Sequence, residues 1–457
     1  MKKVISIMLL IVMILALGIS ATGCKSTTGD DGAKSDFDGA IPGGTADVSE
    51  EVLAALQNSG KISLYIYGDG KSAGNEETVK WREDFNEYYR QVYGGELEYR
   101  QIVWEGWENT YITQYASKDN ADLIYLFEKN FPKFANRGMV FSVEEMQEMG
   151  VVGFDHPVIQ KDYDLVSTYF KYKGQQFAFA NNMAEADMIF VNESLFKEYN
   201  VKSPSEYYNE GIWNWETFEK CASELTRDTD GDGASDVFGY YGWDGNFVIN
   251  AAGGQLVKLQ DDGTLVVGLE DAGTIQGLEN YANIFGRLKC AGKIGFGTGK
   301  LGMIAWMPQN EDDNLIGANG RTKYTFEWSM VPYPLDERTN VDGIRSGKSY
   351  AWCVSSTAEN PQGCINYIIA SKTYSAEKPK PGQIKYEDVF TAEQIEMIND
   401  CTRKAVVPIY QGVGTLWSAQ WDFWGMVGKG RAASEVVNSY KSMFEAQVQL
   451  ENNYATH

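Results

Sequence analysis

The pattern of apolar and polar positions in the first part of the chain predicts strands that alternate with amphipathic helices. Residues 61–67 alternate like a half-buried strand, and a helical pattern over 81–92 follows a Gly-Asp-Gly turn. A strand over 97–103, a helix over 107–117 and a strand over 122–127 continue the series. Elements in this order predict an α/β fold with a parallel sheet and right-handed crossovers.

Charged residues stand where these predicted strands end. Asp69 follows the first strand, and Glu128 and Lys129 follow the third. Ligands of parallel α/β sheets gather at the carboxyl ends of the strands. We therefore expect these three side chains to contact a bound molecule.

The same periodicities continue through the rest of the chain, and no internal repeat occurs. Further strands are predicted at 176–182, 328–334 and 350–355, and helices at 274–288 and 436–448. A glycine-broken turn before Trp306 resembles a phosphate-binding loop only superficially, because its Gly-Lys pair lacks the following Ser or Thr.

An acid-rich loop follows a capped helix in the middle of the chain. Asn214 can accept hydrogen bonds from the first turn of a helix that begins at Trp215, and the loop begins at Asp228. Acids occupy its first, third, fifth and ninth positions, with Gly233 at the sixth, as in calcium-binding loops. The twelfth position is Gly239 rather than a bidentate Glu, so another ligand would have to complete the shell.

This loop predicts either a structural Ca²⁺ site or an Asp/Gly turn that is held by side-chain-to-backbone bonds. The metal ligands would be Asp228, Asp230, Asp232, Ala234 through its carbonyl, and Asp236.

Composition narrows the function. The 457-residue chain has a formal net charge of −23, which would repel phosphate backbones, so nucleic acid is not an expected partner. Only two histidines occur, which nearly excludes histidine-based catalysis and His-rich zinc sites. The cysteines form no CxxC motif, and disulfides or plain buried thiols are both open for Cys221, Cys290, Cys353, Cys364 and Cys401.

The N-terminus predicts export. Two lysines precede an apolar run that is short for a membrane span, and small residues then lead to Gly23 and Cys24. This ending resembles a bacterial lipobox, with Ala21 where the pattern prefers leucine, and it implies that residues 1–23 are a signal peptide. Acyl chains on Cys24 would anchor the protein to the outer face of the cell membrane, and the polar stretch to residue 60 would be a flexible tether. The alternative is a retained membrane helix.

Several short stretches in a fixed order carry a resemblance to a known family. They are 121–124, 134–140, 179–180, 189–192, 215–218, 251–254, 299–303, 331–334 and 350–355. From about residue 61 to its end, the chain resembles the extracellular solute-binding proteins of bacterial ABC importers, and within them the sugar- and oligosaccharide-binding group. The resemblance implies two α/β lobes joined by crossing strands, with a ligand cleft between the lobes. Lobe 1 would comprise 61–181 plus 336–375 and lobe 2 would comprise 185–332 plus 376–457, with hinges near 181–184 and 331–335.

The resemblance also implies positions for residues that contact the solute. Trp306 matches a position where relatives often place an aromatic ring that stacks on a sugar, the alternative being core packing. Glu185 follows the first hinge, where relatives often place an acid that binds hydroxyl groups, the alternative being a solvated surface acid. Further candidates are Asn181, Trp243, Asp244 and Arg345.

Three tryptophans near the C-terminus are expected mainly between the lobes. Trp417, Trp421 and Trp424 favour core packing, and Trp417 is also a candidate to line the cleft.

The resulting hypothesis is a monomeric binding protein without enzymatic activity. It would capture a carbohydrate outside the membrane by lobe closure and deliver it to the permease subunits of an ABC transporter. The alternatives are the same fold with a peptide or polyamine as cargo, or a secreted glycoside hydrolase, which would need a pair of acids flanking the bond.

Overall fold

The computed structural model describes residues 49–67, 76–103, 106–127, 129–160, 169–242, 244–318 and 321–454, without the side chains of 180–184 and 310–313. The predicted signal peptide, Cys24 and most of the tether lie outside these residues.

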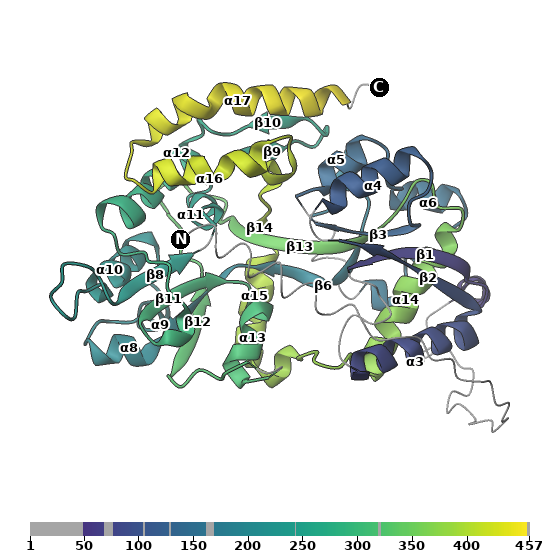
Figure 1. Ribbon diagram of the computed structural model, residues 1–457, viewed down its shortest axis with the longest axis horizontal. Helices are drawn as coiled ribbons and strands as arrows, with labels where there is room; N and C mark the ends of the chain where they lie inside the picture. Colours follow the sequence, from purple (N-terminus) through teal and green to yellow (C-terminus); the bar gives the residue numbers. More distant parts are fainter. Residues whose placement is uncertain are drawn as a thin grey trace, which may run out of the picture. The chain divides into compact units, whose positions relative to one another are not determined.

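The first sheet contains the predicted parallel strands. Its order is β14-β13-β3-β1-β2, and β6 pairs with β13 beside this path (Figure 1). β1 runs parallel to both β2 and β3, which confirms the predicted parallel sheet, whereas β13 is antiparallel to β3 and β6. The strands are β1 (Gly60–Tyr67), β2 (Gly95–Ile102), β3 (Leu123–Phe127), β6 (Phe179–Ala186), β13 (Arg345–Val354) and β14 (Ala405–Val406).

Aromatic side chains join two long helices that pack on this sheet. α3 (Glu76–Tyr93) buries Phe85, Tyr88 and Tyr89 on one face, and α14 (Pro361–Glu377) packs against it through Tyr374. The ring centroid of Tyr374 lies 4.9 Å from that of Tyr88 and 5.3 Å from that of Phe85. Gly94, at φ +61°, ends α3 in a conformation that favours glycine.

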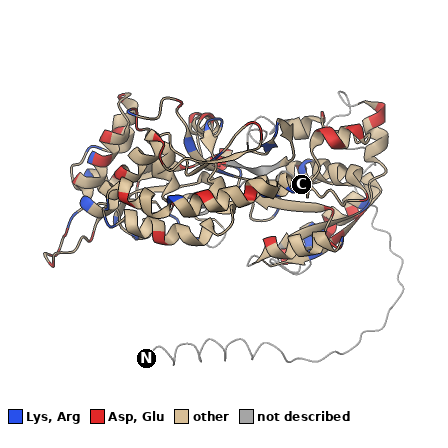
Figure 2. Cartoon of the chain, turned by 90° about the horizontal axis from the view of Figure 1, so that it is seen from above, with Lys and Arg blue, Asp and Glu red and all other residues tan. Residues whose placement is uncertain are grey.

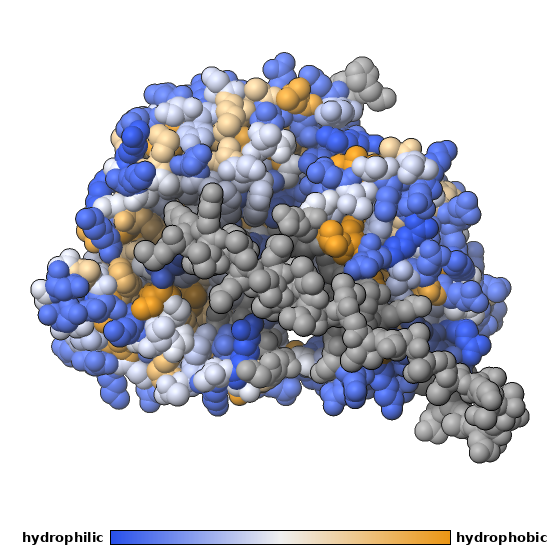
Figure 3. Space-filling view, viewed as in Figure 1, coloured by the Kyte–Doolittle hydropathy of each residue, from blue (hydrophilic) through white to orange (hydrophobic). Residues whose placement is uncertain are grey.

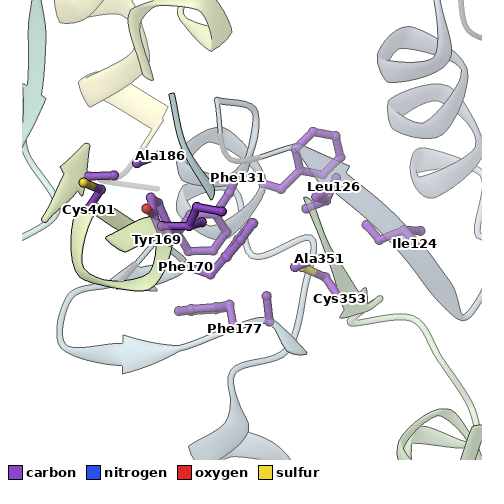
Figure 4. Close-up of a cluster of buried hydrophobic side chains, with 14 of the residues drawn as sticks. Ile124, Leu126, Phe131, Tyr169, Phe170, Phe177, Ala186, Ala351, Cys353 and Cys401 are labelled. Atoms are coloured by element: carbon purple, nitrogen blue, oxygen red, sulfur yellow. The ribbon is translucent and has the colours of Figure 1, made fainter. Parts of the chain in front are cut away.

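Other helices and a dense apolar cluster accompany the sheet. Figure 4 shows part of this cluster, in which Phe131, Phe170 and Phe177 gather near the strands that carry Leu126 and Cys353. The Phe131 ring meets those of Phe170 and Phe177 at centroid distances of 5.3 and 5.7 Å. Replacing such a buried ring with alanine costs about 3–5 kcal/mol. The remaining elements of this region are α2 (Glu50–Leu56), α4 (Trp107–Ala116), α5 (Phe131–Asn136), α6 (Val143–Glu148), β4 (Lys171–Tyr172) and β5 (Gln175–Gln176).

The second sheet has the order β12-β7-β11-β8. α10 (Trp215–Leu225) packs on it through Phe218, whose ring lies 5.0 Å from that of Tyr240 in β8. Asn214 caps this helix as predicted, since its side chain accepts from the Thr217 N–H at 3.1 Å. The strands are β7 (Met188–Asn192), β8 (Phe238–Gly242), β11 (Leu301–Trp306) and β12 (Trp328–Pro332), and the neighbouring helices are α8 (Glu193–Glu198), α9 (Pro204–Asn209) and α13 (Pro308–Ile316).

Two connections join the sheets. β6 runs beside β13 as far as Ala186 (Figure 1). After Asp187 the chain continues as β7 of the second sheet. The Asp187 N–H donates to the Ser346 carbonyl at 2.9 Å, which ties the first connection to β13. The chain returns between Pro332, the end of β12, and Arg345. The predicted hinges and lobe boundaries, which concern motion between the lobes, stay predictions.

The C-terminal helices and α12 (Ala272–Tyr281) share a separate apolar cluster. α16 (Leu416–Val427), α17 (Ala433–Tyr454) and α12 lie together in Figure 1, with the small sheet of β9 and β10 beside them. The predicted helix over 274–288 continues from α12 as a wider π-helical segment, Ala282–Arg287. The remaining elements are α11 (Asn246–Ala251), β9 (Val257–Leu259), β10 (Leu265–Val267) and α15 (Ala392–Thr402).

The surface matches the acidic, polar composition. Asp and Glu residues occur on many helices and loops along the described chain (Figure 2). The described surface in Figure 3 is mainly hydrophilic, with separate small apolar spots. Among the described residues, no helix combines the length and apolar character that a membrane crossing requires. The five cysteines in this part are buried free thiols, namely Cys221, Cys290, Cys353, Cys364 and Cys401.

Candidate functional site

A pocket of about 650 Å³ lies where β2 and β3 end. Its walls come from the start of α4, the residues after β3, the start of α5, the loop before α16 and the first turns of α16. A position at the carboxyl ends of parallel strands is the one expected for a ligand of this fold. The volume lies in the range of small-molecule sites.

Lys129 and Trp417 meet in this pocket. The Lys129 Nζ lies 4.0 Å from the centroid of the Trp417 ring and 5.8 Å from that of Phe127. Trp417 is 38% exposed, so about a third of its surface remains open to a solute beside the contact with Lys129. The structure thus brings together two candidates from distant parts of the chain, a cation and an aromatic surface.

Glu108 supplies the acidic group of the pocket wall. Its carboxylate accepts from the Asn130 amide at 2.7 Å and forms an ion pair with Lys133. Both Lys133 and Glu108 are mostly buried, and their charges offset each other. Together with Asn109 and Ser418, these groups give the pocket several hydrogen-bonding partners for a polar solute.

Asp244 lies behind the pocket wall and is only 5% exposed. Its carboxylate accepts from the Asn246 N–H at 2.9 Å and from the side-chain amide of Gln411 at 3.3 Å. Gln411 itself lines the pocket. Asp244 therefore contacts the pocket indirectly, through Gln411, a residue that no sequence pattern indicates.

Glu185 and Trp306 lie on other elements. Glu185, in β6, is 4% exposed and accepts from the Gln309 N–H at the start of α13, at 3.3 Å. A carboxylate at a helix N-terminus is electrostatically favourable. Trp306 ends β11 and is half-buried against the apolar cluster of which Figure 4 shows a part, an arrangement compatible with both of its alternatives. Their roles in binding a solute stay predictions.

Arg345 lines a separate pocket of about 890 Å³ with residues of α15. Its guanidinium donates to the Tyr333 carbonyl, in the second connection between the sheets. This bond fits a role in holding the connection, and contact with a solute stays a prediction for Arg345.

The structure describes only some of the other candidate residues. Asp69, Glu128 and Trp243 lie outside the described residues, and Asn181 lies in β6 with its side chain outside the description. The core packing expected of the C-terminal tryptophans fits Trp424, which is buried with its ring 5.1 Å from that of Tyr281, whereas a place between the lobes stays a prediction. The expected core packing is wrong for Trp421, which is 55% exposed because it lies on the solvent side of α16.

Three carboxylates of the acidic loop converge. Oxygen atoms of Asp228, Asp230 and Asp236 lie within 4.8 Å of one another. N–H groups of Gly233 and Gly231 hold the pKa of Asp228 below its usual range, and the Thr229 side chain does so for Asp236. Hard oxygen ligands of this kind suit Ca²⁺.

The same loop also fits its alternative as a hydrogen-bonded turn. Asp228 accepts from the N–H groups of residues 230, 231 and 233, and Asp232 accepts from the Ala234 N–H at 2.8 Å. Asp232 is not among the three converging acids. The calcium site and its ligands stay a prediction.

Two α/β lobes, joined by crossing strands and with a pocket at the strand ends, define the class of two-lobe solute-binding proteins. The sequence makes the assignment more specific. Residues 73–363 match the family described as bacterial extracellular solute-binding protein, and the chain belongs to this family. No curated protein matched the sequence.

Solved structures support the fold. An ABC substrate-binding protein from Listeria monocytogenes in complex with cycloalternan is similar, with a TM-score of 0.58 at 15% identity over 85% of this chain and 98% of that one. An extracellular solute-binding protein from Staphylococcus aureus in complex with maltose has a TM-score of 0.60 at 13% identity, over 85% and 98%. An ABC transporter solute-binding protein from Agrobacterium vitis with bound D-mannitol has a TM-score of 0.56 at 14% identity, over 85% and 98%.

Proposed function

We propose that this protein captures a carbohydrate outside the cell membrane by lobe closure and delivers it to the permease of an ABC importer. The observation that carries the proposal is the pocket in which the open ring of Trp417 lies beside polar groups from the strand ends. Sugars present flat C–H faces and many hydroxyls, and they are bound by aromatic rings together with hydrogen-bonding side chains. The carbohydrates in the three similar structures support the same cargo class.

The pocket disfavours a polyamine as cargo. Two of its lining residues, Lys129 and Lys133, carry positive charge, and only Glu108 among its described lining residues carries negative charge. A cationic cargo would therefore meet an unfavourable field at this wall. The acidic composition alone had left this alternative open.

Hydrolysis is disfavoured for a similar reason. A glycoside hydrolase needs two carboxyl groups on either side of the bond that it cleaves. Glu108 is paired with Lys133, and no second acid occurs among the described lining residues. We infer a receptor that binds and releases its solute unchanged.

The membrane attachment belongs to the same proposal. A signal peptide over residues 1–23 and acylation of Cys24 would place a monomeric receptor on the outer face of the membrane, close to its permease. The family description as extracellular supports the side of the membrane.

A thermal-shift screen tests the cargo class. The panel contains maltose, maltotetraose, D-mannitol, spermidine and a mixture of short peptides. A carbohydrate that binds should raise the melting temperature with concentration, since binding to the native state stabilises it by mass action. A shift with only spermidine or peptides would refute the carbohydrate proposal, and conversion of the sugar during incubation would refute the absence of catalysis.

A further inference from the structure

A network of buried polar side chains lies directly behind one wall of the pocket. Its members come from the loop before α11, the first residue of α11, the 3₁₀ turn Ile409–Gly412 before α16 and α16 itself, and each is at most 6% exposed. They are Asp244, Asn246, Tyr410, Gln411 and Gln420. Burying polar groups is unfavourable unless they are hydrogen-bonded, so such a network needs a reason beyond packing.

The network fixes the orientation of the Gln411 amide. The carboxylate of Asp244 can only accept, and one of its oxygens is occupied by the backbone N–H of Asn246 at 2.9 Å and the Asn246 amide at 2.5 Å. The other oxygen faces Gln411 at 3.3 Å. The group of Gln411 that faces an acceptor-only carboxylate must be its NH₂ group.

The second hydrogen of that NH₂ group is also used. Gln411 Nε2 lies 3.1 Å from the Gln420 Oε1, which in turn accepts from the Tyr410 hydroxyl at 2.8 Å. Both donors of the Gln411 side chain therefore point into the protein.

The oxygen of the same amide is left for the pocket. An amide is planar, with its oxygen and nitrogen on different sides of the carbon, and Gln411 lines the pocket. Within the described part of the chain, no hydrogen bond uses the Gln411 Oε1. The wall thus offers an acceptor whose orientation is set from behind.

We propose that Gln411 determines specificity by accepting a hydrogen bond from one hydroxyl of the solute, and that Asp244 is the positioning residue that holds its amide in this orientation. This inference rests on the proposed function, because it requires that the solute occupies the pocket. In this arrangement Asp244 contacts Gln411 and does not contact the solute.

The arrangement selects for a donor at one position of the sugar. A solute that carries hydrogen, fluorine or a methyl ether in place of that hydroxyl leaves the Gln411 oxygen without a partner in a closed site. We expect the loss of that hydroxyl to weaken binding at least tenfold, about 1.4 kcal/mol.

One measurement tests the orientation without any solute. In NMR spectra of the protein with ¹⁵N-labelled glutamine side chains, the Gln411 signals are those that disappear in Gln411→Leu. We expect slow solvent exchange of both Nε2 protons and faster exchange in Asp244→Asn, whereas the exposed Gln383 exchanges fast in both proteins. Fast exchange for Gln411 in the natural protein, or no change in Asp244→Asn, would overturn the positioning role.

A second measurement tests specificity. Dissociation constants are compared for maltose, maltotetraose and D-mannitol and for their monodeoxy and monofluoro analogues. The natural protein and Trp421→Ala should bind the sugar at least tenfold more tightly than the analogue that lacks one particular hydroxyl. Gln411→Leu should lose this preference at that hydroxyl alone, and Asp244→Asn should reduce it. An unchanged pattern in Gln411→Leu would refute the role of Gln411.

The two measurements separate this inference from the proposed function. If none of the sugars binds the natural protein, the carbohydrate proposal and the hydroxyl partner both fail, while the exchange data still decide the orientation of Gln411. If Gln411→Leu does not fold, as judged by its melting temperature, sequential triple-resonance spectra of the natural protein assign the Gln411 signals instead, and Asp244→Asn then decides both parts.

Discussion

Replacing Trp417 with alanine should weaken sugar binding without unfolding the protein. The side chain is 38% exposed, and a tryptophan side chain has about 250 Å² of surface, so about 95 Å² remains open. A sugar ring that covers half of this area would bury about 50 Å², worth about 1.2 kcal/mol at roughly 25 cal/mol per Å². The dissociation constant should therefore rise about eightfold.

The chain provides a matched control for this experiment. Trp421 lies one turn further along α16, with its ring 5.9 Å from that of Trp417, and it is 55% exposed. It does not line the pocket, so Trp421→Ala should leave affinity unchanged although it removes the same side chain from the same helix.

Isothermal titration calorimetry with the strongest sugar from the thermal-shift panel measures the effect. Trp421→Ala should leave the melting temperature close to that of the natural protein, because this side chain is 55% exposed. Trp417→Ala should lower it only modestly, because the side chain is 38% exposed and its contact with Lys129 contributes about 0.5–1 kcal/mol. Equal affinities for Trp417→Ala and Trp421→Ala would refute the assignment of this pocket as the sugar site.

Three further predictions concern stability and reactivity. If the acidic loop binds Ca²⁺, adding CaCl₂ should raise the melting temperature and EGTA should reverse this, whereas Asp236→Ala should abolish the response; an equal response in the variant would exclude the loop. Burial raises the pKa of the Cys221 thiol to about 12, so alkylation at pH 8 should modify it only after unfolding, as peptide mass spectrometry would show. For Asp336, burial would raise the pKa, but hydrogen bonds from Arg338 and Asn280 outweigh it and hold the pKa below its usual range. This carboxylate therefore stabilises the fold above about pH 4 and loses its contribution as the pH falls through its folded-state pKa. Urea unfolding should show that the natural protein exceeds Asp336→Asn in free energy of unfolding by more at pH 7 than at pH 3.

The fold was predictable because its signals are local. The alternation over 61–67 became β1 (Gly60–Tyr67), and the asparagine before Trp215 became the helix cap, since periodicity and capping depend on residues a few positions apart. The π-helical end of the α12 segment was not predictable, because its apolar spacing resembles that of a continuing α-helix.

The site was predictable only in part, because its members come from distant segments. Lys129 could be found because it follows a strand in a parallel sheet. Its contact with Trp417 depends on how the C-terminal helices pack, and Trp421 shares the same helix and the same local pattern. Gln411 carries no local signal, since its role depends on Asp244, which lies in a different segment.

The contact between Lys129 and Trp417 also contributes to any affinity that is measured for a sugar, because the sugar competes with Lys129 for the same ring. The two residues come from the end of β3 and the start of α16, so they join the strand ends of the first sheet to the C-terminal helices. A cation–aromatic contact at a partly exposed site contributes about 0.5–1 kcal/mol. A sugar that stacks on Trp417 must share or replace the contact with Lys129, so the observed binding energy is a difference between two interactions with the same ring. This competition favours solutes that cover the Trp417 ring and also offer the Lys129 ammonium group a hydrogen-bond acceptor. Only such solutes replace the interaction energy that is lost when the contact between Lys129 and Trp417 is displaced.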